Sequence, residues 1–146
     1  MKILLAALAV CTLSSLPTLA QKKPVAKPKT AVTAPTAAIA AGKAVYTQNC
    51  LSCHQADGGG VDGMNPPLIK TSYVLGDKTR IVKVVLNGLQ GVDIDGEEYN
   101  NAMPSYDFLT DQQIADVLTY VRNSFGNKAT PISMAEVKAT RAANKK

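Results

Sequence analysis

Apolar side chains recur at helical spacing in two stretches of the chain. The clearer stretch follows Thr110 and Gln113, a residue pair typical of a capping box at a helix start. Its apolar positions are Ile114, Val117, Leu118, Val121 and Phe125, and Gly126 is expected to close the helix. The second stretch predicts a helix over Asp77–Leu86, with Asp77 as its cap, Ile81, Val84 and Val85 on its apolar face, and Gly88 after its end.

Two further helices are predicted from composition and capping residues. Residues 39–49 favour helix, and Gly42 inside them indicates that another helix approaches closely, because a mid-helix glycine costs about 1 kcal/mol relative to alanine. Ser133 and Glu136 offer a second capping box for a short last helix that runs to about Ala142.

Two stretches between these helices have other patterns. Gly58-Gly59-Gly60, Gly63 and Pro66-Pro67 predict an irregular loop over residues 55–68. Residues 91–99 alternate around Asp95-Gly96, a type I′ turn signal, and so predict a short β-hairpin. Two strands alone are marginally stable in water, so this hairpin is expected to lie on another part of the fold. The pattern as a whole predicts an all-α domain of about four helices with one short hairpin.

The first 20 residues have the pattern of a signal peptide. Lys2 precedes an apolar run that continues with few polar interruptions to Leu16, and cleavage is expected after Ala20. We therefore expect a periplasmic or otherwise exported protein. The run is too short and too often interrupted to favour a membrane span. Lipidation at Cys11 remains an alternative, although Val10 fits poorly before the cysteine of a lipoprotein box.

Composition divides the rest of the chain into three parts. Residues 21–37 are rich in Pro, Ala, Thr, Val and Lys without an apolar period, which predicts a solvated, semi-extended linker. A basic tether towards a membrane or a partner is the functional alternative for this segment. The folded domain is expected to span residues 38–127. Residues 128–146 are expected to form a C-terminal tail with the short last helix, and the sequence assigns this tail no role.

The formal charge of +5 does not describe the predicted domain. Between residues 39 and 127 there are six basic and ten acidic residues, which leaves a net charge of −4. Nucleic-acid binding would require a basic face on the domain itself, so a nucleic-acid partner is not expected. Membrane contact is expected only through the linker or through a partner complex.

The strongest chemical motif is Cys50-Leu51-Ser52-Cys53-His54. Side chains three residues apart share one face of a helical turn, so both thiols can add to the two vinyl groups along one haem edge. His54, the only histidine in the chain, then comes under the iron as its fifth ligand. The motif predicts one covalently bound haem c.

Two other uses of a Cys-x-x-Cys pair fit this sequence less well. A zinc site needs a fourth ligand, and the remaining cysteine, Cys11, lies in the expected signal peptide. A thioredoxin-like enzyme would place the pair beside a βαβ pattern, which the sequence does not contain.

A second axial ligand for the iron is expected from a methionine. Met103 is the preferred candidate, because it follows the predicted hairpin in a loop that Pro104 stiffens. Met134 and Met64 are the other downstream candidates. A methionine that only fills a gap in the core is the alternative for each of them.

These motifs together resemble the class I cytochromes c over about residues 39–127. Gly42 and Tyr46 match the glycine and aromatic residue of that family's first helix, and Val117 and Tyr120 match their packing partners on the last helix. The resemblance implies a cytochrome c fold wrapped round the haem, with a one-electron carrier function. It also implies that the carbonyl of Pro66 accepts a hydrogen bond from His54, and that Leu68 packs on the haem's proximal face. The haem-binding residues expected in full are Cys50, Cys53, His54, Pro66, Leu68 and Met103.

The segment from the hairpin to Met103-Pro104 is similar to the cytochrome modules that serve bacterial periplasmic dehydrogenases and oxidases. Redox partner proteins are therefore expected, although the sequence specifies neither donor nor acceptor. Two other functions stay open: a haem enzyme or gas-binding protein with five-coordinate iron, and a fixed cytochrome subunit of a dehydrogenase or oxidase. Histidine and methionine together would leave no open position for a substrate, which favours an electron carrier that is not an enzyme.

Acidic residues gather in the segments expected around the haem. Asp57 and Asp62 lie in the glycine-rich loop, four further acids lie in the hairpin, and Asp107 follows Met103. They either surround the exposed haem edge and steer a positively charged partner, or they are ordinary solvated loop charges.

Overall fold

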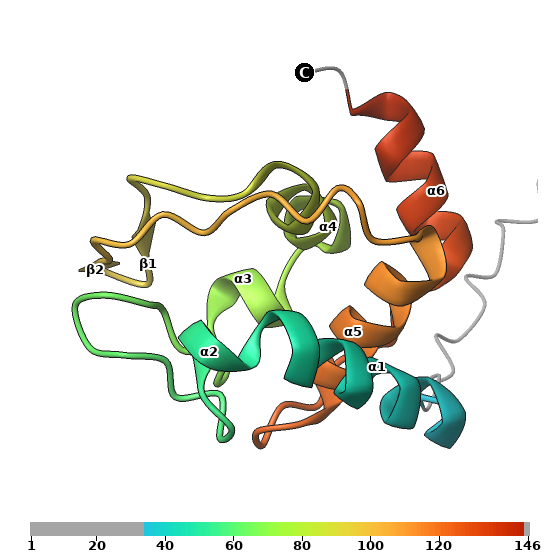
Figure 1. Cartoon of the computed structure of the whole chain (residues 1–146), viewed down its shortest axis with the longest axis horizontal. Helices are drawn as coiled ribbons and strands as arrows, with labels where there is room; N and C mark the ends of the chain where they lie inside the picture. Colours follow the sequence, from blue (N-terminus) through green and yellow to red (C-terminus); the bar gives the residue numbers. More distant parts are fainter. Residues whose placement is uncertain (1–33, 145–146) are drawn as a thin grey trace, which may run out of the picture.

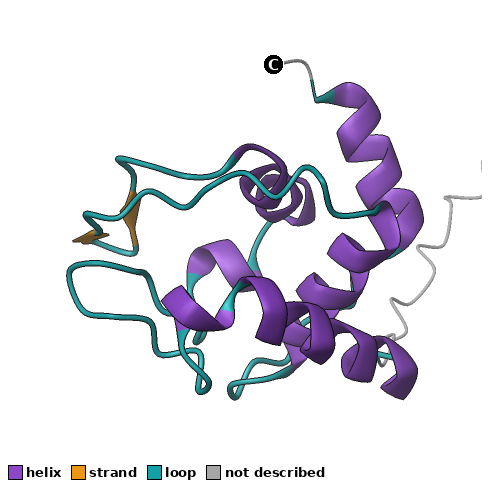
Figure 2. Ribbon diagram, in the orientation of Figure 1, coloured by secondary structure: helices purple, strands orange, loops and turns teal. Residues whose placement is uncertain are grey.

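The computed structural model describes residues 34–144. The expected signal peptide, Cys11 and most of the expected linker lie outside these residues. Within them, six helices and one two-stranded sheet occur (Figures 1 and 2): α1 (Thr36–Asn49), α2 (Leu51–His54), α3 (Ser72–Leu75), α4 (Lys78–Asn87), β1 (Asp93–Ile94), β2 (Glu97–Glu98), α5 (Asp111–Asn123) and α6 (Met134–Ala143). None of these helices is long and apolar enough to cross a membrane.

Helices α1 and α5 cross at Gly42. A Cβ atom at this position would collide with the backbone carbonyl of Asp116 and with the Cβ of Tyr120 on α5. The absence of a side chain therefore permits the close approach that the sequence predicts. Next to the crossing, the rings of Tyr46, Tyr120 and Phe125 pack with centroids 5.4–5.6 Å apart.

The predicted helix caps are present. The side chain of Asp77 accepts a hydrogen bond from the amide of Arg80 at the start of α4, and Gly88 follows its end with φ 78°. Capping boxes join Thr110 with Gln113 at α5, and Ser133 with Glu136 at α6. These local contacts fix where three of the four longer helices begin.

The hairpin forms around the expected turn. Strands β1 and β2 pair antiparallel, and both Asp95 and Gly96 have positive φ, as a type I′ turn requires. Ile94 is the buried residue of the pair, and a side-chain oxygen of Asp95 accepts a hydrogen bond from the amide of Ser72. The hairpin is thus tied to the start of α3, a one-turn helix that the sequence did not predict.

Two helix boundaries differ from the sequence-based expectation. Helix α1 begins at Thr36, so Thr36 and Ala37 are helical rather than part of a linker. Helix α5 ends at Asn123, before Phe125 and Gly126, which both have positive φ. Phe125 therefore leaves the helical face on which its spacing placed it, and its ring covers Gly58 of the glycine-rich loop.

The segment expected as a tail belongs to the hydrophobic core. Ile132 and Val137 are buried to 4% and 0% exposure, and they join the cluster formed by α1, α4 and α5. The side chain of Thr119 on α5 exchanges hydrogen bonds with the backbone of Ile132 in both directions. Helix α6 then lies across α4 and α5 (Figure 1).

Candidate haem site

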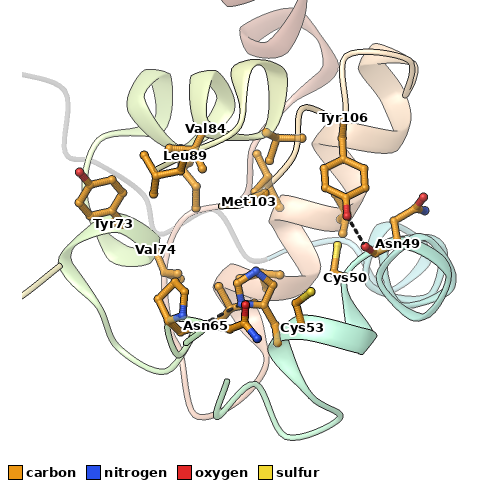
Figure 3. Close-up of a pocket in the computed structure, with 18 of the residues that line it drawn as sticks. Asn49, Cys50, Cys53, Asn65, Tyr73, Val74, Val84, Leu89, Met103 and Tyr106 are labelled. Carbon is orange, nitrogen blue, oxygen red and sulfur yellow. Dashed lines mark hydrogen bonds between the residues drawn. The ribbon is translucent and has the colours of Figure 1, made fainter. Parts of the chain in front are cut away.

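Both thiols of the Cys50–His54 motif face one cavity. Cys50 precedes the single turn of α2, and Figure 3 shows Cys50 and Cys53 side by side at the cavity wall. Cys53 is exposed and Cys50 is partly buried; burial, followed by the charge of Cys53, raises the pKa of the Cys50 thiol to about 11. Both cysteines are free thiols, as addition to vinyl groups requires.

His54 ends α2 and is buried in the same wall. Its Nδ1 lies 2.9 Å from the backbone oxygen of Pro66. A carbonyl only accepts hydrogen bonds, so Nδ1 carries the hydrogen and Nε2 keeps its lone pair for a metal. Burial lowers the pKa of His54, which favours the same neutral ring, while the Pro66 contact acts in the opposite direction.

The glycine-rich loop shapes the wall beneath His54. Its ends are joined by hydrogen bonds from Gly60 N to His54 O and from Leu68 N to Gly58 O. The buried side-chain amide of Asn127 donates to the carbonyl of Leu68 at 2.8 Å, while its oxygen accepts from the amide of Lys70. Asn127 was not predicted as part of the site, because no motif marks it.

Met103 lines the same cavity and lies above the two thiols in the view of Figure 3. Its amide donates to Leu89 O at 2.8 Å, and its carbonyl accepts from Leu89 N at 3.0 Å. This isolated bridge fixes the backbone of the loop to the residues that follow α4. Of the methionines in residues 34–144, Met103 alone lines this cavity, whereas Met64 and Met134 are about half exposed.

Tyr106 also lines the cavity, although the sequence did not predict it as a site residue. Its hydroxyl donates to the backbone oxygen of Asn49 at 2.8 Å, shown by the dashed line beside Cys50 in Figure 3. Its amide donates to Val85 O. Its position three residues after Met103 was the one available signal.

The remaining walls are apolar and come from all parts of the fold. The cavity has a volume of about 1030 Å³ including its open mouth. Its apolar lining residues include Pro66, Pro67, Leu68, Val74, Ile81, Val84, Val85, Leu89, Ile94, Leu109, Val117, Leu118 and Val121. A large, mostly apolar cavity with a few polar groups on it is typical of a cofactor site.

These residues fit a haem. Two thiols stand three residues apart, one imidazole keeps Nε2 available, and one thioether lies across an apolar cavity. No three His, Cys, Asp or Glu side chains among residues 34–144 are grouped so as to hold a metal ion directly. The arrangement defines the class of small helical proteins that carry a covalent haem.

Comparison with known proteins identifies the family. The cytochrome c family model matches residues 39–125. Cytochrome c-552 of Thermus thermophilus is 35% identical over 111 residues, which cover 69% of this chain and 84% of that protein. The cytochrome c subunit of a quinone-dependent alcohol dehydrogenase from Gluconacetobacter polyoxogenes is 40% identical over 90 residues, or 60% of this chain and 19% of that subunit. A subunit of the cbb3-type cytochrome c oxidase of Azospirillum is 38% identical over 98 residues, which cover 62% of this chain and 30% of that subunit.

The chain belongs to the cytochrome c family, as a class I c-type cytochrome. It binds haem c covalently, and its function is electron transfer. The predicted fold class is confirmed: the described chain is rich in helix, with four longer helices, two single-turn helices and one two-stranded hairpin.

Proposed function

We propose that this chain is an exported electron carrier that holds one haem c through Cys50 and Cys53, with His54 and Met103 as axial ligands. The observation that carries the proposal is the placement of the two thiols, His54 and Met103 around one apolar cavity. When bound, the haem supplies an iron that alternates between the ferric and ferrous states.

The surrounding residues prepare these ligands. The Pro66 carbonyl fixes the ring plane of His54 and raises its basicity as a ligand. Leu68 supplies apolar contact on the His54 side of the cavity, and the bridge between Leu89 and Met103 holds the methionine backbone on the other side. A thioether ligand favours ferrous iron and raises the potential, and two ligands kept in both states leave no position for a substrate. On this basis the protein is a carrier and not an enzyme.

Its partners are other redox proteins, reached either by diffusion or within a complex. A role as a free carrier is supported by the match to cytochrome c-552, which extends over 84% of that protein. A fixed subunit is the second candidate, because other relatives are cytochrome subunits of a dehydrogenase and an oxidase. Export is supported by the signal-peptide pattern of residues 1–20, and the Pro-, Ala- and Lys-rich segment that follows would serve as a linker.

Ligand-binding spectra of the haem-loaded protein test the axial ligation. The ferric protein is expected to bind cyanide weakly, and the ferrous protein is expected to leave carbon monoxide unbound. Met103→Ala should open the iron to both ligands, whereas the control Met64→Leu, at an exposed methionine, should behave as the wild type. Tight binding of both ligands by the wild type would show five-coordinate iron and would favour an enzyme or gas-binding protein.

A further inference from the structure

Helix α6 lies beyond the residues that match the cytochrome c family, yet it contacts the loop that carries Met103. The family match ends at residue 125, and α6 begins at Met134. Near its end, Arg141 donates from Nη1 to the carbonyl of Asp107 at 2.9 Å and from Nη2 to the carbonyl of Leu109 at 2.7 Å. Its Nε pairs with Asp111 Oδ1 at 2.7 Å.

These contacts complete the attachment of the methionine loop, residues 103–110. Its first half is held by α4 and by Leu89, which follows that helix. Leu89 and Met103 exchange two backbone hydrogen bonds. On α4, the carbonyl of Leu86 accepts from Ser105 Oγ, and the carbonyl of Val85 accepts from the amide of Tyr106. None of those contacts reaches the second half. Arg141 bonds that half directly, at carbonyls on both sides of the exposed Phe108.

Helix α6 is itself anchored at both ends. Lys78 on α4 forms an ion pair with Glu136 at 2.9 Å and also donates to Pro131 O. Asn87 and Asn144 exchange two side-chain hydrogen bonds, at 3.1 and 2.8 Å. With Val137 fully buried between these contacts, α6 forms a rigid support for the guanidinium of Arg141.

We propose that Arg141 is a positioning residue for the sixth ligand: its fork of hydrogen bonds restrains the methionine loop and keeps the Met103 thioether on the iron. The inference rests on the proposed ligation by Met103. Because a thioether stabilises ferrous iron relative to ferric, the bond is weaker in the ferric protein. In a small fraction of ferric molecules the methionine loop is therefore expected to open locally, with Met103 off the iron. The backbone contacts of the loop determine how large this open fraction is.

Cyanide binding to the ferric, haem-loaded full chain measures this open fraction. A ligand that binds only the open state has an apparent affinity proportional to the fraction open. Arg141→Ala should raise the cyanide affinity about tenfold, equal to about 1.4 kcal/mol. Arg141→Lys keeps a positive charge but lacks the planar fork of donors that spans both carbonyls and Asp111, so it should raise the affinity nearly as much.

Two controls separate positioning from general loosening of the fold. Lys78→Gln breaks the ion pair at the other end of α6 and removes no hydrogen bond of the methionine loop, so it should lower the unfolding midpoint but raise the cyanide affinity much less than Arg141→Ala does. In a Met103→Ala background the iron is already open, so adding Arg141→Ala should change cyanide affinity no further.

Each alternative result has a distinct meaning. An unchanged affinity in Arg141→Ala, alongside tighter binding by Met103→Ala, would overturn the inference and leave the proposed ligation intact. Equal increases in Arg141→Ala and Lys78→Gln would also overturn it, as general destabilisation. Equal affinities of the wild type and Met103→Ala would instead refute Met103 as the ligand, and with it both proposals.

Discussion

A single backbone carbonyl sets the orientation of His54. Pro66 O lies 2.9 Å from Nδ1, and a backbone carbonyl can only accept a hydrogen bond. The tautomer is therefore decided before any haem is present. Because proline also fixes its own φ, this acceptor stands on a stiffer segment than its glycine-rich surroundings would provide.

Covalent attachment is tested at the two cysteines. Because thioether bonds survive denaturation, the wild type should keep its haem on a denaturing gel and give a haem stain. Cys50→Ala or Cys53→Ala should weaken or abolish the stained holoprotein, since each variant removes one of two bonds. Ser52→Ala, at an exposed position between them, should stain as the wild type does. Complete extraction of haem from the wild type by acid acetone would contradict covalent attachment.

The crossing of α1 and α5 depends on the absence of a side chain at Gly42. Replacing this glycine by alanine has two effects of opposite sign on the stability of the fold. Alanine favours a helix interior over glycine by about 1 kcal/mol. However, the same methyl group would press on the carbonyl of Asp116, a backbone atom that cannot rotate away. Overpacking of this kind destabilises by about 1–3 kcal/mol.

Gly42→Ala is therefore expected to lower the thermal unfolding midpoint of the haem-loaded protein. Ala41→Val is the matched control, because it adds volume to the same helix at an exposed residue and should change stability by no more than about 0.5 kcal/mol. A higher midpoint for Gly42→Ala would mean that helix propensity decides, and that the two helices do not press together at this point.

The whole molecule has an uneven distribution of charge. Residues 34–144 contain nine basic and eleven acidic residues, whereas the rest of the chain contains seven basic residues and no acidic one. The hairpin contributes four exposed acids (Asp93, Asp95, Glu97 and Glu98), and its buried Ile94 lines the haem cavity. The glycine-rich loop next to it adds Asp62, and backbone hydrogen bonds from Asn100 and Asn101 join the two segments.

This distribution predicts how salt affects electron transfer with small redox reagents. If the hairpin acids steer encounters, the rate with a cationic reagent falls as ionic strength rises, and the rate with an anionic reagent increases. Glu97→Gln with Glu98→Gln should flatten both trends, while Asp116→Asn on α5 should leave them unchanged. Salt-independent rates for both reagents would mean that these are ordinary solvated charges, and reversed trends would place the basic segments beside the haem edge.

Features that depend on near neighbours in the chain were decided by the sequence. The caps at Asp77, Thr110 and Ser133, the turn at Asp95-Gly96 and the spacing of Cys50, Cys53 and His54 each involve residues at most four positions apart. Their geometry follows from backbone rules that hold in any fold. The expected helices, the hairpin and the covalent haem follow from these local features, together with the family resemblance.

Features that join distant segments were decided only by the tertiary structure. The sequence presented three methionines after the haem motif, and the path of the chain placed Met103, 49 residues after His54, at the cavity wall. The segment after Lys128 resembles a tail in the sequence, because its short helix has few large apolar residues and no local pattern that identifies a packing partner. In the structure, α4 and α5 form a surface for α6. Only on this surface is Val137 buried, and only there does Arg141 contact carbonyls 32 and 34 residues away in the sequence. Such contacts depend on the positions of several elements at once, and no local pattern of residues encodes them.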